Sequence, residues 1–161
     1  MLKKHLLNFS IIILIFLLDR VSKLLIISSS EAYEQYGISV TSFLNFNLIW
    51  NEGIAFGLFS FNEKIYYNLL TIFICLIVAV IIWLMLSSKG FEKLSYIMII
   101  GGSFGNVFDR IFYSAVPDFI DIHFNNFHWF IFNVADIFVT LGIFCLIGIE
   151  IFSKKINENY K

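Results

Sequence analysis

The chain has 161 residues, of which 59% are hydrophobic and 19% aromatic, and its mean hydropathy is +0.84. A water-soluble domain of this length is much less apolar, so the composition indicates an integral membrane protein. The formal net charge of -1 provides no basic surface for nucleic acid, and we expect no nucleic-acid partner. Cys75 and Cys145 each lie within an apolar run, which predicts two small buried hydrophobic side chains.

Four apolar segments have about the length that a membrane-spanning helix needs. They cover residues 6–27, 65–86, 94–113 and 130–152. The first follows two lysines, as a signal peptide would, but it is too long and has no small-residue cleavage site. We therefore expect it to be an uncleaved span. No repeat or linker divides the sequence, which predicts one domain over residues 1–161.

The basic residues predict how these segments are oriented, because lysine and arginine concentrate in cytoplasmic loops. They lie before the first segment, between the second and third, and after the fourth: Lys3, Lys4, Lys89, Lys93, Lys154, Lys155 and Lys161. Lys64 is alone in the loops on the opposite side. Both termini should therefore face the cytoplasm.

Two connections, residues 28–64 and 114–129, are expected on the outer side. In the first, apolar residues alternate with two asparagines: Leu44, Asn45, Phe46, Asn47, Leu48 and Trp50. This period predicts a half-buried strand with the four apolar side chains on one face. In the second connection, Pro117 and the Asn125-Asn126 pair argue against a continuous helix. A small sheet on the membrane surface is the expected result.

Polar residues within membrane segments are costly and usually functional. Counted at about 1.5 Å per residue along each span, they all come to one level near the outer face. Those in the spans are Asp19, Lys23, Asn106, Asp109, Arg110, Asn133 and Asp136, and the outer loops bring Asn51 and Asp118 to the same level. The i,i+4 spacing pairs Asp19 with Lys23, and Arg110 is the cationic neighbour expected for Asp109. Gly101 and Gly105 are spaced to let another helix approach.

Two neighbouring carboxylates in a site of low dielectric constant cannot both ionise easily, so they share a proton. The ionised member can then activate water while the protonated member donates to a carbonyl oxygen, without a metal or cofactor. Asp118, in a loop at the membrane edge, and Asp136, on a helix, suit these roles best. The asparagines at positions 51, 106 and 133 are suited to holding a backbone or a carboxylate.

Other interpretations remain open from the residues alone. Asp121, His123 and His128 could suggest a metal site, but this spacing is a weak signal. Intramembrane charges also occur in small proton-coupled transporters, although these often contain internal repeats and none is present here. A non-catalytic assembly protein could use the same aspartates only to hold helices together.

Five short motifs follow one another along the chain in a distinctive order. They read Asp19-Arg-Val-Ser-Lys23, Asn51-Glu-Gly53-Ile-Ala55-Phe56, Gly101-Gly102-Ser-Phe-Gly105-Asn106-Val-Phe-Asp109-Arg110, Val116-Pro-Asp118-Phe119-Ile-Asp121 and Phe132-Asn133-Val-Ala135-Asp136. Each motif is weak by itself, but their order and spacing resemble the lipoprotein signal peptidase family, the type II signal peptidases of bacteria. The resemblance covers nearly the whole chain.

The resemblance implies an aspartic endopeptidase in the bacterial cytoplasmic membrane, with its site near the outer face. Its substrate would be a diacylglycerol-modified prolipoprotein, cut just before the lipid-bearing cysteine, and a monomer would suffice. The family's catalytic dyad falls on Asp118 and Asp136. Its supporting positions fall on Asp19, Lys23, Asn51, Gly53, Asn106, Asp109, Arg110 and Asn133.

The implied fold is a bundle of four transmembrane helices with a small extramembrane β-cradle and a surface helix on the outer side. The cradle would come from parts of the connection at residues 28–64. Pro117 departs from the family pattern, which usually has a branched aliphatic residue there, and we expect it to stiffen the approach to Asp118.

Overall fold

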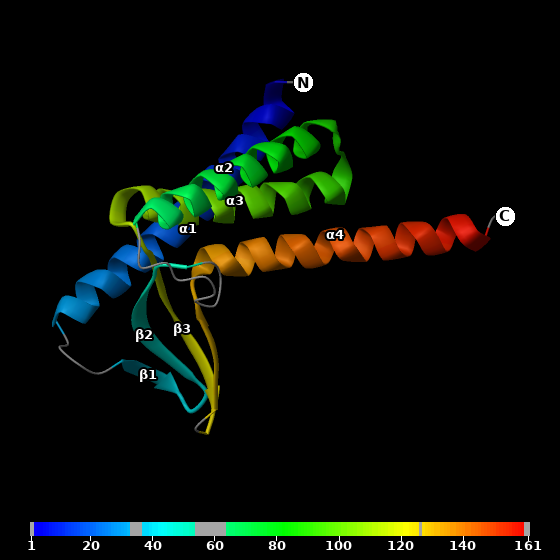
Figure 1. Ribbon diagram of the computed structural model, residues 1–161. Coiled ribbons are helices and arrows are strands. Elements are labelled where there is room, and N and C mark those ends of the chain that lie inside the picture. Colours follow the sequence, from blue (N-terminus) through cyan, green and yellow to red (C-terminus); the bar gives the residue numbers. More distant parts are fainter. Residues whose placement is uncertain (1, 33–36, 54–63, 126, 160–161) are drawn as a thin grey trace.

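A computed structural model describes residues 2–32, 37–53, 64–125 and 127–159. The described residues form four helices and one four-stranded sheet. The elements are α1 (Leu2–Ala32), β1 (Ile38–Thr41), β2 (Leu44–Asn51), α2 (Lys64–Ser87), α3 (Gly90–Tyr113), β3 (Val116–Phe124), β4 (Phe127–Phe132) and α4 (Val134–Asn159). The sheet lies at one end of the helices, whereas both termini and the α2–α3 connection lie away from it (Figure 1).

All four predicted helical segments are present, with shifted ends. α1 is longer than predicted at both ends, and Ser28 and Ser29 continue the helix by donating to the Leu25 carbonyl at 3.0 and 2.7 Å. The prediction for the fourth segment was wrong at its start. Residues 130–132 belong to β4, and α4 begins only at Val134, because the strand pairs with β3 before the helix can start.

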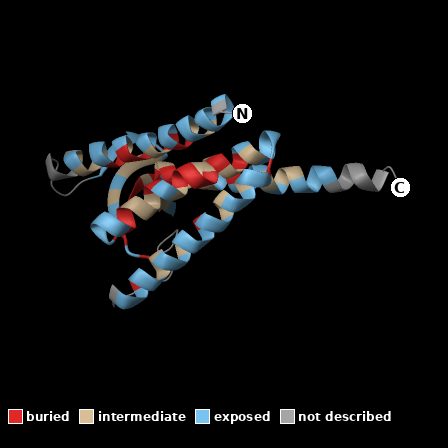
Figure 2. Ribbon diagram, turned by 90° about the horizontal axis from the view of Figure 1, so that it is seen from above, coloured by how far each residue is buried: buried red, intermediate tan, exposed pale blue. Residues whose placement is uncertain are grey.

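Within the described parts of the chain, two helices are long and apolar enough to cross a membrane by length and composition, at Ile65–Ser87 and Val134–Ser153. Their outward faces consist of exposed leucine, isoleucine and phenylalanine, whereas buried residues gather where the helices meet (Figure 2). Cys75 and Cys145 were predicted to be buried and are exposed, because each lies on an outward face of one of these two helices. Such a face is compatible with lipid, where a small apolar side chain needs no cover.

The helix α3 is the centre of the bundle, since it packs against α1, α2 and α4. An apolar cluster of Ile12, Ile97 and Ile100 joins α1 to α3, and Ile81 and Ile82 of α2 pack against it. Nearer the sheet the contacts between α1, α3 and α4 become polar, and this is where the predicted site residues lie.

The sheet is antiparallel, in the order β1-β2-β3-β4. Its first half, β1 and β2, comes from the connection at residues 28–64, as expected, and its second half, β3 and β4, comes from the connection at residues 114–129 and the start of the predicted fourth span. The strand predicted at residues 44–50 is confirmed as β2. A surface helix is absent from residues 37–53 and 114–125, while the apolar stretch at 54–61 lies outside the described residues.

The predicted alternation in β2 holds only for its first half. A register shift between Phe46 and Ile49 interrupts the pairing with β3, so Trp50 is exposed instead of sharing the face of Leu44 and Phe46. The same shift turns the side chain of Asn51 inward, where it is buried. This irregularity positions a site residue.

Candidate active site

Asp118 of β3 and Asp136 of α4 line one cavity of about 180 Å³, between the sheet and the helices. The remaining lining residues combine amides, one guanidinium, one hydroxyl and apolar side chains: Asn51, Ile74, Ser103, Asn106, Arg110, Val116, Asn133 and Val139. The structure therefore brings together two carboxylates that are 18 positions apart in the sequence and come from different elements.

Two neutral amides hold the Asp118 carboxylate. The Nδ2 of Asn51 donates to its Oδ2 at 2.8 Å, and the Nδ2 of Asn133 donates to its Oδ1 at 2.6 Å. Asp118 is only 4% exposed. Burial and, to a smaller extent, the nearby charge of Asp136 raise the pKa of its carboxyl from 3.8 to about 6, although the two amide hydrogen bonds act to lower it. This carboxyl can therefore exchange a proton close to neutral pH.

Asp136 is held by the way in which α4 begins. Asn133 precedes the helix, and its Oδ1 accepts a hydrogen bond from the Asp136 backbone N–H at 3.1 Å. In return, the Asp136 Oδ2 accepts from the Asn133 backbone N–H at 3.2 Å, which completes a reciprocal capping arrangement. The Nδ2 of Asn106 in α3 donates to the other carboxylate oxygen at 2.8 Å. Each oxygen of Asp136 thus has a fixed donor.

Lys23 is completely buried and uses all three of its protons. Its Nζ donates to Asp19 Oδ2 at 2.9 Å, to Asn106 Oδ1 at 2.9 Å and to Asp109 Oδ2 at 2.7 Å. The predicted i,i+4 pair with Asp19 is confirmed. Because Lys23 occupies the amide oxygen of Asn106, the NH2 group of that amide is directed to Asp136.

Asp109 was predicted to pair with Arg110, and this prediction was wrong. Its partners are Lys23 and Arg20 of α1, with Arg20 Nη1 at 2.5 Å from Asp109 Oδ1. Arg110 is not its partner because both guanidinium Nη atoms of Arg110 donate to backbone carbonyls, those of Gly53 and Asn106. Asp19 completes the cluster, as its Oδ1 accepts from the Ala135 backbone N–H at 2.9 Å. That N–H belongs to the first turn of α4 and has no partner within its own helix.

Arg110 instead reaches the end of β2. Its Nη2 donates to the Gly53 carbonyl at 3.0 Å, and its Nη1 donates to the Asn106 carbonyl at 3.2 Å. The Gly53 N–H in turn donates to Asn51 Oδ1 at 2.9 Å. Arg110 therefore fixes the backbone that orients the Asn51 amide, and Asn51 holds Asp118. Asn51 and Gly53, predicted from the sequence alone, take part through this chain of contacts.

Close helix packing depends on three glycines of α3, and a Cβ at Gly101 would lie 2.8 Å from the Cβ of Ile15 in α1. A Cβ at Gly105 would collide with the Asp19 carboxylate, and a Cβ at Gly102 would collide with the Ala135 carbonyl. The predicted close approach at Gly105 is thus to α1. Sequence reasoning did not assign a role to Gly102, and it also missed the apolar cavity residues Ile74 and Val139. Ile74 and Val139 lie within apolar runs, so nothing in the sequence distinguishes them from lipid-facing residues.

Comparison with known proteins gives a consistent result. The family described as signal peptidase (SPase) II matches residues 11–152. A lipoprotein signal peptidase of Pelagibacter ubique (strain HTCC1062) is 52% identical over 159 residues, which cover 98% of this chain and 96% of that protein. A lipoprotein signal peptidase of Francisella tularensis subsp. novicida (strain U112) is 36% identical, over 96% of this chain and 98% of that protein.

Solved structures agree with this similarity. A bacterial membrane enzyme superposes with a TM-score of 0.76 at 25% identity, over 96% of this chain and 91% of the other. A second bacterial membrane enzyme gives a TM-score of 0.70 at 24% identity, over 87% and 89% of the two chains, and supports the fold. The matched family region includes every residue of the two carboxylate clusters described above. This chain therefore belongs to the signal peptidase II family of aspartic peptidases.

Proposed function

We propose that Asp118 and Asp136 form the catalytic dyad of a peptidase that removes signal peptides from prolipoproteins. The observation that carries this proposal is that two carboxylates, Asp118 buried and Asp136 half-buried, are each held by an amide donor and line the same cavity. Neither carboxylate has a lysine or arginine as a hydrogen-bond partner among the described residues, whereas Asp19 and Asp109 have both. The dyad is therefore free to carry and exchange a proton, and the other two aspartates are structural.

In the proposed reaction the two carboxyl groups share one proton and hold a water molecule between them. The ionised carboxylate accepts a proton from this water, whose oxygen attacks the scissile carbonyl carbon. The protonated carboxyl donates to the carbonyl oxygen, which gives a neutral tetrahedral intermediate. When the C–N bond breaks, the carboxyl that took the water proton returns it to the departing nitrogen. The titration belongs to the pair as a whole.

The cavity suits a substrate that arrives within the membrane. Ile74 of α2 and Val139 of α4 form its apolar wall, and these two helices carry the exposed apolar faces. A lipid-modified signal peptide could enter from the bilayer with its acyl chains remaining among lipids. We propose that the bond cleaved is the one just before the diacylglyceryl-modified cysteine. Asn51, Asn133 and Arg110 would then position the substrate backbone or the loop beside it.

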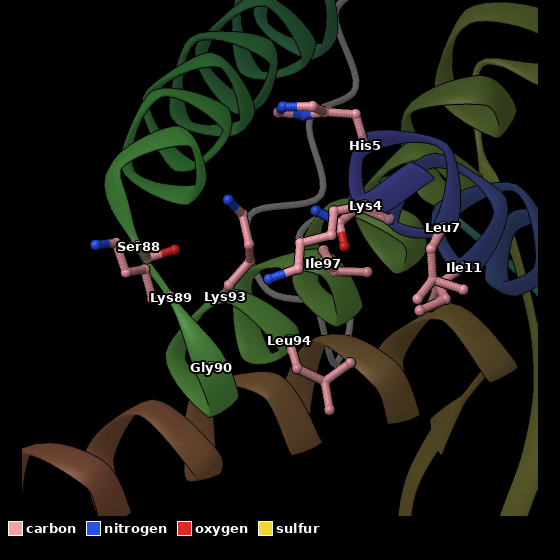
Figure 3. Close-up of a pocket in the computed structure, with 11 residues that line it drawn as sticks. Lys4, His5, Leu7, Ile11, Ser88, Lys89, Gly90, Lys93, Leu94 and Ile97 are labelled. Carbon is pink, nitrogen blue, oxygen red and sulfur yellow. The ribbon is translucent and has the colours of Figure 1, made fainter. Parts of the chain in front are cut away.

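The membrane arrangement that we propose has four spans, both termini in the cytoplasm and the dyad near the outer face, in one domain that works as a monomer. Its support is the distribution of charge. Lys4, Lys89 and Lys93 surround a hollow at the end of the helices away from the sheet (Figure 3). Basic side chains are typical of the cytoplasmic side. In α1 and α3 the charged residues near the sheet neutralise one another, so these helices could cross the bilayer as well.

The test is a cleavage assay on purified protein in detergent. A diacylglyceryl-modified prolipoprotein and its unmodified precursor are incubated separately, with and without a chelator, and analysed by gel shift. The proposal predicts cleavage of the lipidated form alone, regardless of chelator. Cleavage of both forms would overturn the lipid requirement, and loss of cleavage with chelator would overturn the metal-free mechanism. No cleavage by folded protein would favour the transporter or assembly alternatives.

A further inference from the structure

A second cluster of potential ligands lies on the sheet, apart from the dyad. It consists of Asp121, His123 and His128, and one ligand atom from each lies within 4.8 Å of the others. Asp121 and His123 are two positions apart in β3, so their side chains share a face, and His128 of β4 is the direct register partner of His123. A register shift between the pairs of Asp121 and His123 also brings His128 beside Asp121.

The contacts within this cluster leave one buried ring nitrogen, the Nδ1 of His123, without a partner among the described residues. Asp121 is 2% exposed, and both of its carboxylate oxygens contact His128 Nδ1, at 3.0 and 2.9 Å. The two imidazole rings are stacked with centroids 5.2 Å apart. A buried ring nitrogen without a partner is costly unless something else binds it.

The neighbouring strand offers a further acceptor at the same place. Asn45 of β2 is the register partner of Asp121, and its Oδ1 is also buried without a hydrogen-bond partner among the described residues. The cluster thus combines one carboxylate, two imidazoles and an adjacent amide oxygen. Among the described residues, no lysine or arginine forms a hydrogen bond with Asp121. No such side chain would therefore compete with a bound metal ion for the Asp121 carboxylate.

We propose that Asp121, His123 and His128 bind a divalent transition-metal ion of the zinc type. Two imidazoles and a carboxylate are a ligand set that zinc accepts, with water or the Asn45 oxygen in the fourth position. With metal–ligand bonds of about 2.0–2.1 Å, donor atoms in a tetrahedral site lie roughly 3.3 Å apart. The contacts between Asp121 and His128 are already close to that spacing, and shortening the longest separation, up to 4.8 Å, by about 1.5 Å would complete the set.

The ion would link β3 to β4 beyond the hydrogen bonds of the hairpin. Its role is structural, because neither Asp118 nor Asp136 belongs to the cluster. Asp118 lies three positions before Asp121 on the same strand but is not one of the ligands, so cleavage should not depend on the ion. Metal binding and the peptidase reaction remain separate events under this proposal, and each can be tested without the other.

Metal-free protein in detergent is titrated with Zn²⁺ by calorimetry and with Co²⁺ by visible absorption. The expected results are one ion per chain, a tetrahedral Co²⁺ spectrum and a higher Tm with Zn²⁺. H123A and H128A should each weaken binding by about a hundredfold or more, because each removes a ligand. H5A is the matched control, since it removes the one histidine of the chain outside the cluster and should bind Zn²⁺ as the wild type does.

The result that would overturn the proposal is equal Zn²⁺ binding by the wild type, H123A and H128A, or no binding by the folded wild type. Asp121 and His128 would then form an ordinary ion pair. Because H128A removes that pair and could unfold the hairpin, H123A is the decisive variant, and its Tm without metal verifies that it is folded. D136N should bind Zn²⁺ as the wild type does while losing cleavage, which distinguishes failure of this site from failure of the dyad.

Discussion

Asn133 and Asp136 cap each other at the start of α4, at 3.1 and 3.2 Å, while the Asn133 Nδ2 remains available and donates to Asp118 at 2.6 Å. One asparagine thus begins a helix, positions one carboxylate and binds the other. Asn133 therefore serves both the helix cap and the site. A substitution that keeps the cap contact to Asp136 but removes the contact to Asp118 should separate the effect on stability from the effect on activity.

Asn133→Ser is that substitution. A serine hydroxyl still accepts from the Asp136 N–H, so the free energy of unfolding should change by less than about 1 kcal/mol, while Asn133→Ala should lose about 1 kcal/mol more. In the wild type, the hydrogen bond from Asn133 lowers the pKa of the Asp118 carboxyl. Both variants lack this donor, so that pKa should rise, and the alkaline limb of the kcat/KM profile should move to higher pH in both. An unchanged limb in Asn133→Ser, measured by a cleavage pH profile, would contradict this role.

The raised pKa of Asp118 also predicts how stability depends on pH. In the unfolded chain the carboxyl has its ordinary pKa of 3.8, and in the folded chain about 6, so the folded state holds the proton more tightly. This contribution to stability is complete below pH 3.8 and is lost as pH rises through about 6, by roughly 3 kcal/mol in total. Thermal unfolding between pH 4 and 7 should show a steeper decline in wild type than in Asp118→Asn, in which only the Asp136 carboxyl of the pair still titrates. The same dependence of Tm on pH in the wild type and in Asp118→Asn would contradict this prediction.

Lys23 should be essential to stability because it neutralises two buried carboxylates. Lys23→Met leaves Asp19 and Asp109 without that ammonium group, and we expect a loss of about 3–5 kcal/mol in unfolding free energy. Lys3→Met is the control, since it changes an exposed lysine of the same helix. Denaturant or thermal unfolding in detergent measures both. Equal stabilities of the two variants would mean that the cluster contributes little.

A substitution at Gly105 of α3 tests the close packing of α1 against α3, and a substitution at Gly148 of α4 is the control. Gly105→Ala places a methyl group against the Asp19 carboxylate, so α1 and α3 must separate, at a cost of about 1–3 kcal/mol and with reduced cleavage. Gly148→Ala in α4 meets nothing within 4 Å and should leave the Tm unchanged or slightly raised. If the two substitutions have the same effect on Tm, close packing at Gly105 is not required.

The sequence was sufficient to predict the helices, the strand β2 and the convergence of the polar residues, because each rests on a local pattern. Apolar length identifies a helix, alternation identifies a strand, and helical spacing pairs Asp19 with Lys23. The i,i+4 rule was informative because both residues belong to one helix.

Local sequence patterns do not predict which residues of different helices or strands come into contact. Asp109 pairs with Arg20 and Lys23 across a helix interface, and not with the Arg110 that follows it. The start of α4 was predicted too early because the apolar residues of β4 continue the apolar pattern of the helix without a break. The proximity of His123 and His128 to Asp121 likewise depends on a hairpin register that no local spacing specifies.

The most direct test of the dyad is cleavage of a diacylglyceryl-modified prolipoprotein by Asp118→Asn and Asp136→Asn, compared with Glu92→Gln. The control removes the same charge from an exposed carboxylate at the opposite end of α3. Thermal unfolding in the same detergent verifies that each protein is folded. We predict that both aspartate variants lose cleavage by about a thousandfold or more, while Glu92→Gln cleaves as the wild type does. Substantial cleavage by either folded aspartate variant would contradict the assignment of Asp118 and Asp136 as the catalytic pair.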